Sequence, residues 1–135
     1  MFDLIKKAIE KHTKTYLGSY FIIYPGTKLP TEGKTSFIRL TVASQNYNEI
    51  KRSNLTTDAD VVVDFGVFDK SGNSNGVFDI ARDIYNGFTL NPIYVYDERD
   101  EVITTLRVRS ISEQFIGFEG EYNQVNVTIN LFCLN

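Results

Sequence analysis

Residues 121–135, "EYNQVNVTINLFCLN", decide the fold of this chain. Apolar side chains occupy every second position from Val125 to Cys133, and neutral polar ones stand between them: Asn126, Thr128 and Asn130. Because successive side chains of a strand point to opposite faces, this spacing predicts a β-strand with one face toward the core. Its outward face carries no charge, although exposed sheet edges usually carry charges that prevent stray pairing. The three neutral residues are therefore candidates for an assembly surface.

The remaining apolar patterns predict two helices that separate two blocks of strands. One helix runs from Asp3 to about Tyr16, and the second covers residues 77–88, where apolar residues recur at i, i+3, i+4 and i+7. Three strands are predicted before the second helix and three after it: residues 19–25, 37–43 and 60–68, then one strand on each side of the acidic turn at 97–101, then the terminal strand. The strand at 60–68 is apolar on most of both faces, which predicts a central place in the sheet.

This order of elements predicts the fold class. Strands gathered into blocks, with a single helix between the blocks, favour an α+β fold over an alternating βαβ fold. The expected architecture is one domain, residues 1–135, in which a single, mostly antiparallel β-sheet carries two α-helices packed on one face.

Two polar stretches, residues 25–36 and 44–60, interrupt the apolar patterns. The first is rich in Pro, Gly and Thr, and the second in Asn, Thr and Lys. Both are predicted to be long loops, and long loops in compact domains are common sites of binding or assembly.

The chain has few of the residue types on which catalysis depends. It contains one His, one Cys and no Trp. His12 lies on the apolar stripe of the first predicted helix, and Cys133 lies on the core face of the last strand, so both are predicted to be packing residues. The sequence therefore predicts no enzyme, no cofactor and no metal site.

Charge and hydropathy exclude two classes of partner. The net charge is -3 and the pI is about 5.1, which argues against tight nucleic-acid binding through phosphate neutralisation. No apolar run approaches the roughly 20 residues that a membrane-spanning helix needs. The N-terminal residues lack the apolar segment of a secretory signal, so the protein is expected to be made in the cytoplasm and to stay there, with no membrane partner.

Three stretches together resemble the tail-terminator proteins of long-tailed bacteriophages, also called tail completion or minor tail proteins. The first is a Pro-bearing loop that leads into an aromatic, apolar and Arg-containing strand, "PTEGKTSFIRLTV". The second is a strand, a Gly-containing turn and a short helix, "VVVDFGVFDKSGNSNGVFDIARDIYNGF". The third is the aromatic-x-Gln strand with alternating Asn and Val, "YNQVNVTINLF". The three stretches, in this order, extend over nearly the whole chain.

The resemblance implies a structural virion protein. Such subunits form a hexameric ring on the head-proximal end of the tail tube, stop tube polymerisation and offer a surface for head-tail joining. The implied partners are further copies of the chain, the tail tube protein and a head-completion or neck protein, and assembly would take place in the host bacterial cytoplasm. On that interpretation the two polar stretches contact neighbours and the tube. The candidate interface residues are Arg39, Arg107 and Arg109, for intersubunit ion pairs, and Asn126, Thr128 and Asn130.

Two alternatives stay open at this point. The nearer alternative keeps the virion but changes the position, as a neck or head-tail connector subunit or a tail-tube relative that polymerises. A different class is a cytosolic binding module, monomeric or dimeric, whose long loops hold a small ligand or peptide.

Overall fold

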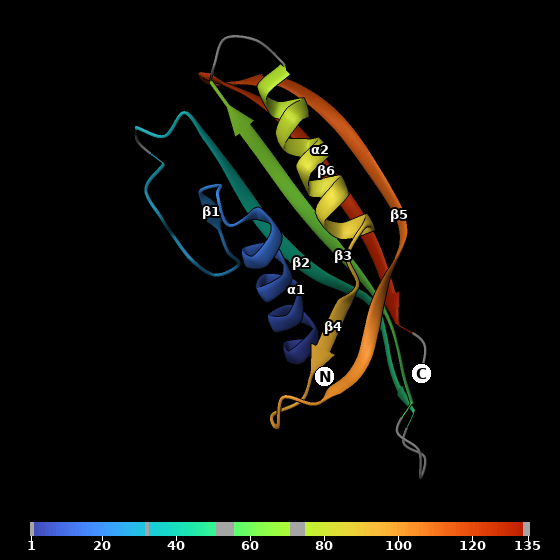
Figure 1. Cartoon of the computed structure of the whole chain (residues 1–135). Helices are drawn as coiled ribbons and strands as arrows, with labels where there is room; N and C mark the ends of the chain where they lie inside the picture. Colours follow the sequence, from blue (N-terminus) through green and yellow to red (C-terminus); the bar gives the residue numbers. More distant parts are fainter. Residues whose placement is uncertain (1, 32, 51–55, 71–74, 134–135) are drawn as a thin grey trace.

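The computed structural model describes residues 2–31, 33–50, 56–70 and 75–133. Two helices and six strands follow one another in the predicted order, with three strands before the second helix and three after it (Figure 1). The helices are α1 (Phe2–Leu17) and α2 (Asn75–Thr89), and the strands are β1 (Ile22–Ile23), β2 (Ser36–Ile50), β3 (Thr56–Asp69), β4 (Ile93–Tyr96), β5 (Val102–Glu119) and β6 (Tyr122–Cys133). The predicted α+β fold is confirmed, and the sheet curls into a half-barrel.

The strands form one sheet in the order β1-β2-β3-β6-β5-β4. Every neighbouring pair is antiparallel except β1 with β2. The predicted central position of residues 60–68 is confirmed, because β3 lies between β2 and β6. The terminal strand β6 is also central, between β3 and β5. Its neutral outward residues Asn126, Thr128 and Asn130 therefore do not belong to an edge strand.

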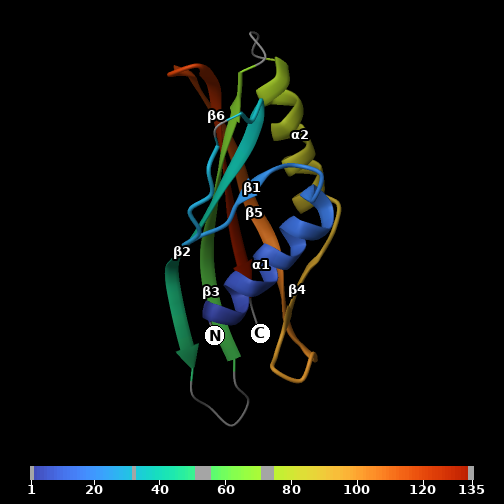
Figure 2. The same cartoon turned by 90° about the vertical axis from the view of Figure 1, so that its left-hand side faces the viewer.

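Both helices cover the same face of the sheet (Figure 2). The buried positions of β6 alternate strictly with partly exposed ones, as the spacing of its apolar residues predicts. Opposite β6, Val61, Val63 and Phe65 of β3 are buried in register with Leu131, Ile129 and Val127. Onto this layer α1 packs Ile5 and Ile9, and α2 packs a further set of fully buried side chains: Val77, Ala81 and Ile84. Each fully buried aliphatic side chain contributes roughly 1.5–3 kcal/mol, so this helix-sheet layer is the main source of stability.

Two hydrogen bonds tie the segment around α1 to α2. The Nε2–H of His12 donates to the carbonyl oxygen of Gly87 over 2.8 Å, and the Tyr20 hydroxyl donates to the Asp83 carboxylate. Burial of the phenol, together with the hydrogen bond to Asp83, raises the pKa of Tyr20 to about 12, so the tyrosine stays neutral across the physiological range. These contacts fix the two helices relative to each other on one face of the sheet.

The prediction of a loop at 44–60 is wrong for the described residues of that range. β2 continues to Ile50 and β3 begins at Thr56, and their backbones pair from Asn46 with Asp60 to Ile50 with Thr56; residues 51–55 lie outside the described part of the chain. β6 accompanies β3 only as far as the pair Ala59–Cys133. Among the described residues the ribbon beyond that point has no third strand beside it, and its sequence lacks the apolar alternation of a half-buried strand. The loop expected at 25–36 is confirmed for residues 25–31 and 33–35, with β2 starting at Ser36; residue 32 lies outside the described part of the chain.

The central packing of β6 leads to the first prediction. Ile129→Ala removes a fully buried side chain between β3, β5 and the helices, and should lower the free energy of unfolding by about 2–5 kcal/mol. Ser112→Ala, at an exposed β5 position in the adjacent row, should change it by less than about 0.5 kcal/mol. Urea denaturation followed by circular dichroism measures both, and equal losses would contradict this placement of the core.

Candidate assembly surface

The face of the sheet away from the helices, called the open face here, carries a continuous set of outward side chains. Cross-strand partners share a face, so the register places side chains of four strands on it. They come from β2 (Phe37, Arg39, Thr41, Ala43), β3 (Asp60, Val62, Asp64, Gly66, Phe68), β6 (Gln124, Asn126, Thr128, Asn130, Phe132) and β5 (Arg107, Ser110, Ser112, Gln114). No helix of the described chain covers this face (Figures 1 and 2).

Hydrogen bonds order the neutral side chains along β6. The Thr128 hydroxyl donates to the Asp64 carboxylate over 2.6 Å, and Asn130 donates to the Ser110 hydroxyl over 2.9 Å. Asn126 accepts from the side-chain amide of Gln124 over 2.9 Å. All three β6 residues are half-buried rather than exposed. The structure therefore brings together the three neutral residues singled out from the sequence, and each already has a partner within the chain.

Arg109 lies at the end of the open face where β5 is irregular. The register between β5 and β6 shifts between Val108 and Ser110, so Arg109 is an extra residue in a β-bulge. Its guanidinium makes an ion pair with Asp60 at 3.3 Å and lies over the Phe132 ring, 4.6 Å from the centroid. Both charged side chains remain substantially exposed, 59% and 40%, so the ion pair adds little to stability. The bulge and the ring hold the guanidinium in one place on the surface.

Of the other two candidate arginines, Arg107 is the cross-strand partner of Phe132, the residue whose ring Arg109 covers, whereas Arg39 lies on β2. Arg39 shares a row of the sheet with Gly66 and Asn126, and its guanidinium lies 5.5 Å from the centroid of the Phe68 ring. Gly66 permits this arrangement, because a Cβ there would meet the Phe68 ring at 3.1 Å. Arg107 is exposed and borders a hollow of about 490 Å³ between β5 and the segment 88–92.

An aromatic cluster at the far end of the open face was not singled out by the sequence analysis. Phe37 and Phe68 stack with ring centroids 4.5 Å apart, and Tyr122 meets Phe37 edge-on at 5.2 Å. Cations lie over the rings at this end of the sheet: Lys34 over Phe21, Lys70 over Tyr122 and Arg39 over Phe68. The alternation of residues 37–43 contains the signal, because it places Phe37 on the same outward face as Arg39 and Thr41.

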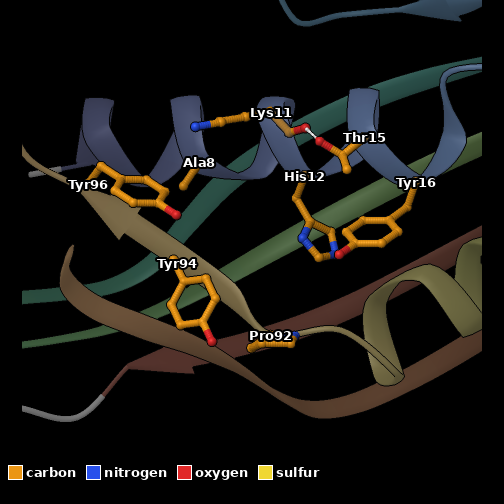
Figure 3. A pocket seen from close by; sticks show the side chains of 8 residues that line it. All are labelled: Ala8, Lys11, His12, Thr15, Tyr16, Pro92, Tyr94 and Tyr96. Carbon is orange, nitrogen blue, oxygen red and sulfur yellow. Dashed lines mark hydrogen bonds between the residues drawn. The ribbon is translucent and has the colours of Figure 1, made fainter. Parts of the chain in front are cut away.

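A separate small hollow of about 160 Å³ lies between α1 and β4 (Figure 3). Its walls are aromatic, formed by Tyr16, Tyr94 and Tyr96 around His12, and Lys11 lies over the Tyr96 ring, 4.6 Å from its centroid. The His12 ring packs against Tyr16 and Phe88, with centroids 4.6 and 4.9 Å away. His12 is only 7% exposed, which confirms its predicted place at the edge of the core.

The described residues offer little for catalysis. Among them, no three His, Cys, Asp or Glu side chains gather closely enough to hold a metal ion. Cys133 is buried, as its core-facing register predicts. No helix in the described part of the chain is both long and apolar enough to cross a membrane.

Known proteins resemble this chain in fold. No protein-family model matches the sequence, and no curated protein matches it. One solved structure resembles the chain with a TM-score of 0.70 and 18% sequence identity, over 100% of this chain and 96% of the other. The name of that protein describes no activity. The likeness therefore shows that the whole α+β architecture recurs in another protein of nearly the same length.

His12 generates a prediction about pH dependence. Burial disfavours the imidazolium and lowers the pKa of His12, which the hydrogen bond to the Gly87 carbonyl only partly offsets. The unfolded chain therefore takes up this proton first. The contribution of His12 to the free energy of unfolding should be complete above about pH 6.5 and should fall as pH drops below that value toward the lowered folded-state pKa.

The sole histidine makes this measurement specific. Urea denaturation between pH 5 and 8 should show a loss of stability below pH 6.5 in the wild type, and the loss should be smaller in His12→Gln, which keeps a donor for the Gly87 carbonyl but has no group that titrates in that range. NMR titration of the imidazole supplies the pKa directly. A folded-state pKa at or above 6.5 would contradict the assignment.

Proposed function

We propose that this chain is a tail terminator of a long-tailed bacteriophage. It is a structural subunit of the virion and not an enzyme. Six copies form a ring on the head-proximal end of the tail tube, where the ring ends tube polymerisation and presents a surface to a head-completion or neck protein. Assembly takes place in the host cytoplasm, with no cofactor, metal or membrane.

One observation carries the proposal alongside the resemblance of the sequence. The open face lies over the central strand β6, and no helix of the described chain covers it. The β6 side chains in its middle, Asn126, Thr128 and Asn130, are neutral and hydrogen-bonded, and the carboxylate beside them, Asp64, accepts from Thr128. A charged face resists burial because desolvating each ion costs several kcal/mol. Amides and hydroxyls that already have partners lose much less on contact, so this face suits a neighbouring subunit or the wall of a channel.

The size of the chain agrees with two contacts per subunit. A stable interface buries on the order of 1,200–2,000 Å², half of it from each partner. A subunit in a ring uses two different patches, since a head-to-tail contact closes when its rotation closes. The chain exposes 7957 Å², so two such patches would require roughly a fifth of its surface.

The proposal predicts a closed ring whose assembly depends on the open face. Mass measurement in solution and negative-stain imaging should show rings of six, and the protein added to polymerising tail tubes should shorten them and permit head joining. Asn126→Lys with Asn130→Lys places two charges on the middle of the open face and should abolish ring formation.

The matched control adds the same charge to the helical layer. Thr15→Lys with Asn86→Lys alters two exposed helix positions, and should leave the rings intact. Thermal unfolding of both double variants verifies that they fold. Unchanged tube length and head joining with wild-type protein would reject the terminator, long tubes of the chain itself would identify a tail-tube relative, and rings that survive both asparagine changes would reduce the open face to an ordinary sheet surface.

A ring around the path of the genome should not retain DNA. Each phosphate neutralised by a cation adds affinity that would slow ejection, and the net charge of this chain is -3. We expect no measurable binding of duplex DNA at physiological salt in a fluorescence-anisotropy titration. Retention at submicromolar protein would contradict this prediction.

A further inference from the structure

Two stretches of backbone at opposite sides of the sheet have no strand beside them among the described residues. β1 pairs with β2 only at Ile38 and Arg39, and β4 pairs with β5 only over Val102–Leu106. The outer edge of β2 from Leu40 onward and the outer edge of β5 from Arg107 onward are therefore free of strand partners. Free edges present rows of unpaired N–H and C=O groups to any strand that approaches.

The two free edges lie at the same level of the sheet. The register connects Leu40 through β3 and β6 to Glu113, and it connects Ala43 in the same way to Ser110. Below this level both edges are irregular, with shifts between Ser44 and Asn46 on one side and between Val108 and Ser110 on the other. Residues 40–43 and 110–113 thus form two regular four-residue windows in matching rows.

Three of the four rows in these windows join small or apolar side chains, and the fourth joins Leu40 to the exposed Glu113. On the open face, Thr41 and Ser112 share one row, and both are small, neutral and exposed. On the helix side, Val42 and Ile111 share the next row, and each packs against the core while remaining partly exposed. If two such edges met, Val42 and Ile111 would cover each other and extend the core across the junction.

Strand direction decides how the edges meet. β2 and β5 run in opposite directions, because each successive pair from β2 through β3 and β6 to β5 is antiparallel. Copies related by rotation about an axis roughly along the strands would therefore bring β2 of one copy antiparallel to β5 of the next. Repeated around a closed ring, such junctions leave no free sheet edge, which is how barrels remove free edges.

We propose that residues 40–43 of β2 pair in antiparallel register with residues 110–113 of β5 in a second copy of the chain. This contact deepens the proposed function, since it supplies the head-to-tail junction of the ring and joins the sheets of successive subunits into one continuous sheet. It assigns the lateral contact to the sheet edges and leaves the open face as the wall of the closed barrel.

Cysteine cross-linking tests the pairing. In the double variant Thr41→Cys and Ser112→Cys, two strands separate the new thiols within one chain, so their Cα atoms lie roughly 14 Å apart and no disulfide forms inside the chain. Mild oxidation should therefore give a ladder of covalent dimers up to hexamers on non-reducing gels. The wild-type chain, whose Cys133 is 1% exposed, controls for the native thiol.

Single variants separate head-to-tail pairing from other geometries. A mixture of Thr41→Cys and Ser112→Cys should give one heterodimer, and neither variant alone should cross-link. A homodimer of Ser112→Cys would indicate two-fold pairing of β5 edges and overturn the proposal. The matched control is Thr41→Cys with Asn86→Cys, which moves one thiol to the exposed face of α2; equal ladders from the two double variants would also overturn it.

Charge substitutions give a second readout that does not depend on thiols. Thr41→Lys with Ser112→Lys puts like charges opposite each other in the paired edges and should weaken self-association at least tenfold in analytical ultracentrifugation. Thr41→Lys with Ser112→Glu should restore it. Equal self-association of the two variants would overturn the edge pairing.

Failure of this inference is distinct from failure of the proposed function. Rings in wild-type protein without the Thr41–Ser112 ladder overturn the edge pairing and leave the terminator standing. A ladder from a chain that neither caps tubes nor supports head joining keeps the edge pairing and rejects the terminator. A chain that shows neither self-association nor a ladder at any attainable concentration overturns the edge pairing.

Discussion

The strict alternation of β6 is the constraint on which the rest of the structure depends. Its apolar side chains from Val125 to Cys133 must leave water, and the antiparallel partners β3 and β5 set the layer in which they do so. One sheet face thereby becomes the core, and α1 and α2 both pack on it. The same alternation obliges the other face to be polar in its middle. Two helices are too few to cover two faces, so the open face follows from the amount of apolar surface in the chain.

The sequence predicts this architecture well because its information is local. A period of two or of 3.6 identifies a strand or a helix without knowledge of partners, and the apolar character of residues 60–68 on both sides points to a central strand. The two-stranded ribbon of residues 46–50 and 56–60 shows the limit of this local pattern. Its strands pair with each other beyond the reach of β6, so their pairing leaves no apolar signature and the stretch resembles a loop. β1 is likewise shorter than the strand predicted at 19–25, because only Ile22 and Ile23 pair with β2.

The surface divides in the same way between local and non-local information. The outward positions of Asn126, Thr128 and Asn130 follow from alternation alone. Their partners do not, because Asp64 lies 64 residues from Thr128 and Ser110 lies 20 residues from Asn130. The ion pair of Arg109 with Asp60 also depends on a β-bulge that the residue types do not predict. The register of the sheet, which is a long-range property, converts separately predicted residues into one surface.

The neutrality of the outward β6 side chains is easier to understand in a central strand than in an edge strand. An edge strand needs charged side chains to prevent pairing with strands of other molecules. β6 needs no such protection, because β3 and β5 pair with both of its backbone edges. Protection against stray pairing is needed instead at the free edges of β2 and β5. There the sheet is irregular near Ser44 and Arg109, yet between residues 40 and 43 and between 110 and 113 it is regular, and the outward side chains Thr41 and Ser112 are uncharged. Both irregularities lie at the same end of the two regular windows, so they would limit the register that a strand in the proposed pairing can adopt at that end.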